Sequence, residues 1–198
     1  MEFHVISNGK WPMNQFADKI APLHGEDVFF HIREKRRSAE EISQGIIEMR
    51  KRGTASEQIV VNDRVDIAHC FGTGGAQLTN QSLSVRDVLQ YFPSLRIGKS
   101  VHSIKEAQQA EGEGADYVMF GHIYPTSSKP GKEPRGLRLL QELTDSVTLP
   151  VIAVGGIKPE HAPDIQEAGA AGIAVVSGLL DADDAVKQYE WYRKGWGS

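Results

Sequence analysis

The sequence of 198 residues predicts a small α/β protein, a single (β/α)8 barrel. Three observations point to it: short β-branched runs alternate eight times with longer amphipathic segments, each repeat averages about 25 residues, and the strand segments read as continuous apolar runs rather than as strict alternations. Continuous apolar runs are typical of parallel strands that are buried on both faces. Repeats this short leave no room for a second domain, so residues 1–198 are expected to form one TIM-barrel domain. A doubly wound open sheet is the alternative.

The predicted strands come first in each repeat, and they span residues 3–6, 28–32, 59–61, 76–78, 95–101, 115–120, 151–154 and 172–176. Helical patterns lie between them. One helix is expected to follow Ser38, because Glu41 three residues later completes the spacing of a capping box. Ser103 and Glu106 repeat that spacing before another helix. The one long loop, residues 125–134, follows the sixth strand.

Composition excludes several classes of partner. The net charge is −4, with 22 basic and 26 acidic residues interspersed, so neither a nucleic-acid surface nor a membrane-binding patch is expected. The N-terminus lacks the pattern of a secretory leader, and we expect a cytoplasmic protein. Cys70 is the single cysteine, which suggests no zinc or redox motif and is expected to be buried and inert. No two histidines have a metal-binding spacing, so no metal site is indicated.

Polar side chains follow the ends of most predicted strands. In a barrel these ends meet at one face, where binding and catalytic groups gather. In chain order they are His31 and Arg33, Asn62 and Asp63, Gln77 and Thr79, Ser100 and His102, His122, Gly155 and Gly156, and Ser177 and Gly178.

The last two strand ends predict a phosphate site. Gly155 and Gly156 follow the seventh strand, and Val176 and Ser177 lie at the end of the eighth. Small residues beside a helix start leave backbone N–H groups open to a phosphate dianion. A phosphorylated substrate is therefore expected. The alternative is that the glycines only permit tight turns.

His122 directly follows the sixth strand and is the candidate catalytic residue. The unperturbed pKa of histidine, about 6.5, lets its side chain take and give a proton near neutral pH. A structural hydrogen-bond role is the alternative at this position.

Several segments together resemble the thiamin phosphate synthase superfamily, in order and along almost the whole chain. They are the stretches at residues 61–68, 100–107, 115–117, 124–129, 150–157 and 174–177. The resemblance implies barrel enzymes that join a pyrimidine pyrophosphate to a thiazole phosphate using magnesium. It assigns Arg33 and Lys35 to phosphate oxygens, and it places Asn62 and Asp63 after the third strand.

The sequence departs from the synthase pattern at three positions. Ser82 stands where the resemblance implies a second magnesium carboxylate, and a hydroxyl is a poor ligand for that ion. His31 stands where synthases usually have glutamine, and His122 where they have proline. Both histidines resemble the thiazole tautomerase branch, the TenI-like proteins.

The tautomerase branch implies an isomerase that needs no cofactor or metal and that aromatises a thiazole carboxylate phosphate. His122 would move the proton. A thiamin phosphate synthase and a non-catalytic, phosphate-binding regulatory barrel are the alternatives. The partner expected is the small phosphorylated thiazole, and a homodimer is possible. The substrate-binding residues expected are His31, Arg33, Lys35, Asn62, Gln77, Ser100, His102, Thr126 and Lys129.

Overall fold

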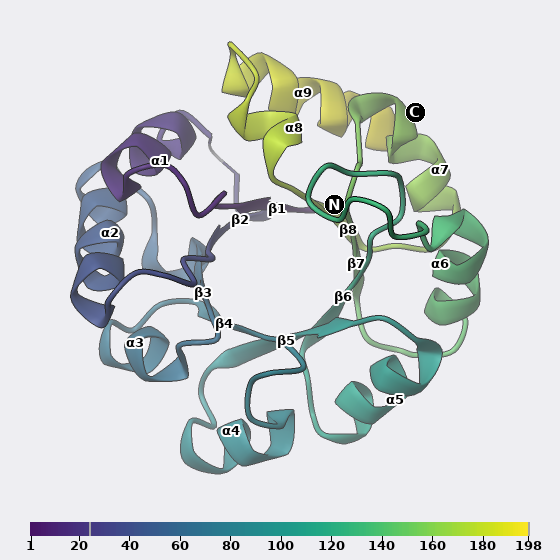
Figure 1. Cartoon of the computed structure of the whole chain (residues 1–198), viewed down its shortest axis with the longest axis horizontal. Coiled ribbons are helices and arrows are strands. Elements are labelled where there is room, and N and C mark those ends of the chain that lie inside the picture. Colours follow the sequence, from purple (N-terminus) through teal and green to yellow (C-terminus); the bar gives the residue numbers. More distant parts are fainter. Residues whose placement is uncertain (24, 198) are drawn as a thin grey trace.

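The structure is a computed structural model that describes residues 1–23 and 25–197. Its parallel strands form a closed barrel in chain order from β1 to β8, and helices surround the barrel (Figure 1). The predicted (β/α)8 barrel is confirmed, and the open sheet is excluded because β1 pairs with both β2 and β8.

The strands are β1 (Glu2–Ile6), β2 (Val28–Ile32), β3 (Ile59–Asn62), β4 (Gly75–Leu78), β5 (Arg96–Val101), β6 (Tyr117–Gly121), β7 (Val151–Val154) and β8 (Gly172–Val175). The helices are α1 (Met13–Ile20), α2 (Ala39–Lys51), α3 (Val65–Cys70), α4 (Val85–Tyr91), α5 (Ile104–Gly112), α6 (Gly136–Thr144), α7 (Ala162–Glu167), α8 (Ser177–Leu180) and α9 (Ala185–Trp196). Two 3-10 turns, η1 (Ser56–Gln58) and η2 (Pro159–His161), precede β3 and α7.

One of the two predicted capping boxes forms completely. Ser38 accepts a hydrogen bond from the Glu41 N–H, and the Glu41 carboxylate accepts one from the Ser38 N–H, so α2 begins as predicted. At α5, Ser103 accepts from the Glu106 N–H. The Glu106 carboxylate instead accepts from the N–H of His102, at 2.6 Å. It thereby ties the start of α5 to the end of β5, one residue earlier than the box predicts.

The inside of the barrel has two different halves. An apolar cluster of Ile6, Tyr117, Met119, Ile152 and Ala174 fills the side formed mainly by β6 to β8. The side formed by β1 to β5 instead buries polar side chains, among them His4, His31 and Gln77, each with 0% of its surface exposed. Because buried polar groups need hydrogen-bond partners, this half is tied together by side-chain hydrogen bonds.

Cys70 is exposed, so the prediction of a buried thiol is wrong. It is the last residue of α3, a helix of six residues whose buried face is provided by Ile67 and Ala68. The short helix therefore leaves its final side chain in solvent.

None of the helices in residues 1–23 and 25–197 is long and apolar enough to cross a membrane.

Candidate functional site

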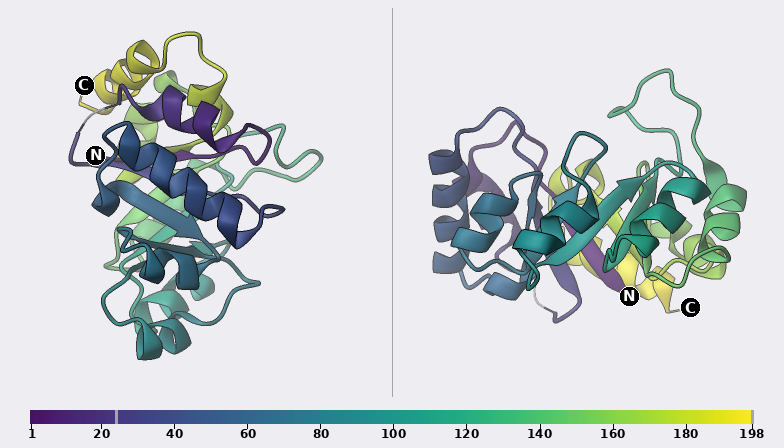
Figure 2. Two further views of the ribbon diagram at one scale, coloured as in Figure 1. Left: turned by 90° about the vertical axis from the view of Figure 1, so that its left-hand side faces the viewer. Right: turned by 90° about the horizontal axis from the view of Figure 1, so that it is seen from below.

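The carboxyl ends of the strands form the candidate site. The loop between β6 and α6 rises from this end of the barrel and is its most prominent projection (Figure 2). Backbone hydrogen bonds close the base of the loop, from Arg135 N to His122 O at 2.8 Å and from Gly136 N to Ile123 O at 3.2 Å. The loop therefore starts and ends at fixed points on the barrel.

The loop after β2 is anchored by a buried carboxylate. Glu34 is 7% exposed; it accepts a hydrogen bond from Ser7 Oγ at 2.7 Å and one from Arg37 Nε at 2.9 Å. Ser7 Oγ in turn accepts from the backbone N–H of Arg33 at 2.9 Å. This network holds the backbone on which Arg33 and Lys35 stand, and both of these side chains are exposed.

Positive charges converge from two loops. Partial burial lowers the pKa of Lys129, and the charges of Lys132, Arg135 and Arg33 lower it further. Arg33 follows β2, whereas the other three belong to the loop after β6. Thr126 lies in the same turn as Lys129, since its carbonyl accepts from the Lys129 N–H at 3.2 Å. Mutual repulsion of this kind favours a bound polyanion, which would offset it.

Asp63 lies in a network of hydroxyl groups after β3. Its Oδ1 accepts hydrogen bonds from Ser82 Oγ at 2.6 Å and from Thr79 Oγ1 at 2.9 Å. Lys99 Nζ donates to the Thr79 carbonyl at 2.8 Å. Burial lowers the Lys99 pKa, while the negative charges of Glu113, Glu106 and Asp63 oppose that change. The site therefore holds one carboxylate that is already engaged by two hydroxyl donors.

This donor set does not fit the magnesium site that the resemblance implies. Mg²⁺ takes oxygen ligands in octahedral geometry and favours carboxylates. Here the Ser82 hydroxyl donates a hydrogen bond to Asp63, and the positively charged Lys99 lies near the pair. In the described part of the chain, no three His, Cys, Asp or Glu side chains are grouped so that they could hold a metal ion.

The structure places His31 and Gln77 below the mouth of the barrel. Both are 0% exposed, and their direct contact with substrate stays a prediction. Gln77 Nε2 donates to Ser100 Oγ at 3.0 Å. His31 Nδ1 lies 3.3 Å from Oδ1 of the half-buried Asn62. Asn62 and Ser100 thus stand between the buried layer and the mouth.

His102 and His122 are both held by backbone carbonyls. His102 Nδ1 lies 3.1 Å from the Gly121 carbonyl, and His122 Nε2 lies 3.2 Å from the Lys132 carbonyl. His122 is 5% exposed and connects the end of β6 to the long loop. This contact is the structural role considered for His122; its proton-transfer role stays a prediction.

Gly155 and Gly156 are required by close packing as well as by backbone conformation. Their φ angles are +100° and +68°. A Cβ on Gly155 would lie 2.3 Å from the Cβ of His122, and one on Gly156 would lie 2.4 Å from the Pro125 carbonyl. The tight-turn alternative therefore accounts for both glycines, and a phosphate here, bound also by Val176 and Ser177, remains a prediction.

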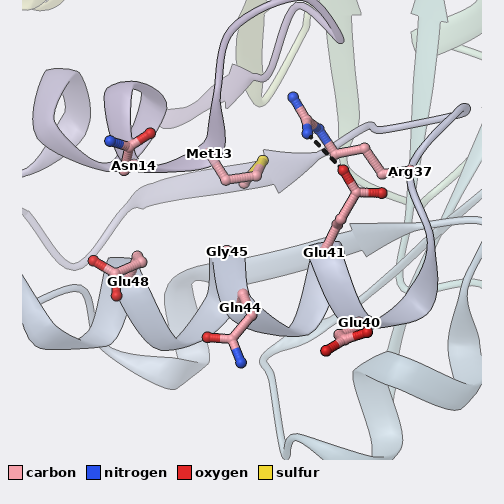
Figure 3. Close-up of a pocket in the computed structure, with 8 residues that line it drawn as sticks. All are labelled: Met13, Asn14, Arg37, Glu40, Glu41, Gln44, Gly45 and Glu48. Carbon is pink, nitrogen blue, oxygen red and sulfur yellow. Dashed lines mark hydrogen bonds and ion pairs between the residues drawn. The ribbon is translucent and has the colours of Figure 1, made fainter.

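Surface hollows elsewhere do not coincide with this site. One of ≈350 Å³ lies between α1 and α2, where Arg37 pairs with Glu41 at 3.1 Å (Figure 3). Its lining contains none of the predicted site residues.

Sequence reasoning missed the buried polar residues at the opposite end of the barrel. Arg96 Nη2 donates to both carboxylate oxygens of Glu2, at 2.8 and 2.9 Å, and Glu2 lies 3.1 Å from His4. The guanidinium of Arg96 lies between the rings of Phe29 and Tyr117, 4.7 and 4.6 Å from their centroids. The available signal was that Glu2 and His4 stand at alternate positions of the first strand.

Comparison with known proteins places the chain in a family. The family model described as "Thiamine monophosphate synthase" matches residues 6–179. A thiamine-phosphate synthase of Methanococcus vannielii is 33% identical over 187 residues, which is 94% of this chain and 90% of that protein. One of Pyrococcus furiosus is 39% identical over 134 residues, 68% of this chain and 65% of that protein.

Solved structures agree. A thiamine phosphate pyrophosphorylase from Pyrococcus furiosus superposes with a TM-score of 0.82 and 29% identity, covering 99% of this chain and 95% of that one.

These relatives overturn one prediction. The isomerase expected from His31 and His122 is wrong, since the matching proteins are thiamine-phosphate synthases, which are transferases. The family match covers most of the sequence and the fold matches throughout. The chain therefore belongs to the thiamine monophosphate synthase family.

Proposed function

We propose that this chain makes thiamine phosphate by joining a pyrimidine pyrophosphate to a thiazole phosphate, with release of pyrophosphate. The observation that carries the proposal is the match to a thiamine-phosphate synthase over 94% of the chain. The arrangement of charged groups at the strand ends supports the same reaction, because both substrates and one product are polyanions.

The reaction exchanges one bond at one carbon. The C–O bond between the pyrimidine's substituted carbon and pyrophosphate breaks, and both electrons leave with the pyrophosphate. The ring nitrogen of the thiazole then donates its lone pair to that carbon and forms a C–N bond. Negative charge grows on the departing oxygen, so cations placed there lower the barrier.

Arg33, Lys129, Lys132 and Arg135 are the cations proposed to offset this charge, because their mutual repulsion is relieved by a bound pyrophosphate. His122 is proposed to supply a proton to the departing oxygen. The thiazole phosphate is proposed to bind at Gly155, Gly156, Val176 and Ser177. No step is assigned to a metal ion, because the donor set around Asp63 does not fit one.

The test is to incubate the protein with both substrates and to follow pyrophosphate release and thiamine phosphate formation together. We expect Lys129→Gln to raise the KM for the pyrimidine pyrophosphate. Lys51→Gln is the matched control, because Lys51 lies at the end of α2 and pairs only locally, with Glu48. Binding of both ligands without any product would favour the non-catalytic regulatory barrel instead.

A further inference from the structure

A chain of side chains crosses the polar half of the barrel from end to end. Glu2 lies 3.1 Å from His4 Nε2, and His4 Nδ1 lies 2.8 Å from His31 Nε2. His31 Nδ1 then lies 3.3 Å from the amide of Asn62, at the carboxyl end of β3. Both histidines are 0% exposed. The chain thus links the bottom of the barrel to its mouth without passing through solvent.

The carboxylate at the bottom fixes the direction of every hydrogen bond above it. Burial would raise the Glu2 pKa, but hydrogen bonds from His4 and Arg96 outweigh burial and lower it to about 2. An ionised carboxylate only accepts hydrogen bonds, so His4 Nε2 must donate to it. Burial lowers the pKa of His4, which keeps the ring neutral and leaves its Nδ1 as an acceptor. His31 Nε2 must then donate to His4 Nδ1.

The same logic determines the state of His31. Burial, together with the neighbouring His4, holds the pKa of His31 well below its usual value, so this ring is also neutral. With the proton on Nε2, its Nδ1 is an acceptor and needs a donor. An amide oxygen facing it would set two acceptors against each other, whereas a half-turn of the amide brings the NH₂ group to His31. The carbonyl oxygen of Asn62 then faces away from His31.

Neighbouring groups stabilise these hydrogen-bond directions from Glu2 to Asn62. Arg96 approaches Glu2 from β5 and, being only a donor, reinforces its role as acceptor. Phe29 stacks on the His4 ring at 5.0 Å, and the Tyr117 ring lies 5.5 Å from it. These contacts hold the plane of the His4 ring.

We propose that Glu2 is a positioning residue: through His4 and His31 it turns the Asn62 amide so that a hydrogen-bond acceptor faces the substrate. Asn62 then selects a ligand ring that carries an amino or N–H group over one that carries a carbonyl at the same position. The inference rests on the proposed function only in taking that ring to be the pyrimidine.

The structure predicts a reversal when Glu2 is replaced. In Glu2→Gln the Arg96 guanidinium, which can only donate, is expected to hydrogen-bond to the new amide oxygen. The amide NH₂ group then faces His4. His4 Nε2 must then accept, so the protons of both rings move to Nδ1. His31 Nδ1 donates to the Asn62 oxygen, and the Asn62 NH₂ group faces the mouth. The acceptor offered to the substrate becomes a donor.

Nitrogen NMR of the full chain with ¹⁵N-labelled histidine tests the direction without any substrate, because protonated and bare ring nitrogens have well-separated shifts. We expect both buried rings to carry the proton on Nε2 in the wild type and on Nδ1 in Glu2→Gln. A wild-type Nδ1 proton on either ring, or unchanged rings in Glu2→Gln, would overturn the proposal. The wild-type spectrum decides alone if the variant does not fold.

Calorimetry with two pyrimidine pyrophosphates, one with a ring amino group and one with a carbonyl in its place, tests the consequence. We expect the wild type to prefer the amino ligand and Glu2→Gln to weaken its binding roughly tenfold. Asn62→Asp added to Glu2→Gln should restore the preference, because a carboxylate accepts from both His31 and the ligand. A purely structural role for Glu2 predicts no rescue, and that result would refute the positioning role. If the tautomers are as expected but no thiamine phosphate forms, only the proposed function fails.

Discussion

The buried histidine pair makes the stability of the fold depend on pH in a predictable window. His4 and His31 are 0% exposed and their pKa values are lowered by burial, so the folded protein leaves both rings neutral. In the unfolded chain both would bind protons near pH 6.5. The unfolded state therefore binds more protons than the folded state at low pH. The contribution of the two histidines to the free energy of unfolding is complete above pH 6.5 and is lost as the pH falls below that value.

The size of the effect follows from proton counts. A histidine that stays fully neutral in the folded protein costs at most about 1.4 kcal/mol of unfolding free energy at pH 5.5 relative to pH 8, so the two together cost at most about 2.8 kcal/mol. Glu2, whose pKa is lowered to about 2, stabilises the fold above its unfolded value, and this contribution is lost only at lower pH. Its unfolded value is about 4.3, so the two windows are separate.

Urea unfolding followed by circular dichroism between pH 5.5 and pH 8 measures this slope. We expect His31→Gln to reduce it by about half. The slope is informative even if the variant is less stable overall. His69→Gln is the control, because His69 is exposed on α3. A flat wild-type profile, or an unchanged slope in His31→Gln, would refute the assignment of two neutral buried rings.

Three further outcomes are expected. Ser82→Asp adds a second carboxylate beside Asp63 and should give the protein a magnesium affinity, measured by calorimetry, that the wild type lacks; equal magnesium binding by the two proteins contradicts the assignment of this position. His122→Gln keeps a donor for the Lys132 carbonyl but cannot supply a proton. We therefore expect kcat to fall about 10²-fold or more while the melting temperature stays near normal. An unchanged kcat would leave His122 only its structural role. Gly156→Ala should lower the melting temperature by several degrees more than Gly131→Ala, which has a similar φ but open space around it, and equal losses would exclude close packing as the cause.

The barrel was predictable because its evidence is local and repeated. Each β-branched run followed by an amphipathic segment indicates one unit, and the count of units gives the fold. The polar interior was not predictable in this way. His4 and His31 meet only because β1 and β2 pair with Ile6 opposite His31, a register that neither strand specifies alone.

The candidate site was predictable in location rather than in detail. Strand ends identified Asn62 and Ser100 at the mouth, but they could not distinguish an exposed histidine from a fully buried one such as His31. The isomerase prediction failed for a different reason. It rested on the identity of single positions, chiefly two histidines, whereas similarity along most of the chain points to synthases.

The hydrogen bonds at the base of the loop after β6 also bear on His122. Tyr124 N donates to the Gly155 carbonyl at 3.0 Å, and Arg135 N donates to the His122 carbonyl at 2.8 Å, so both ends of the segment between them are tied to the barrel. That segment carries Lys129 and Lys132, and the Lys132 carbonyl lies 3.2 Å from His122 Nε2. The Lys132 carbonyl can only accept, so this contact requires a hydrogen on His122 Nε2. An anion bound at Lys129 and Lys132 therefore acts on the same segment that holds the His122 ring in place.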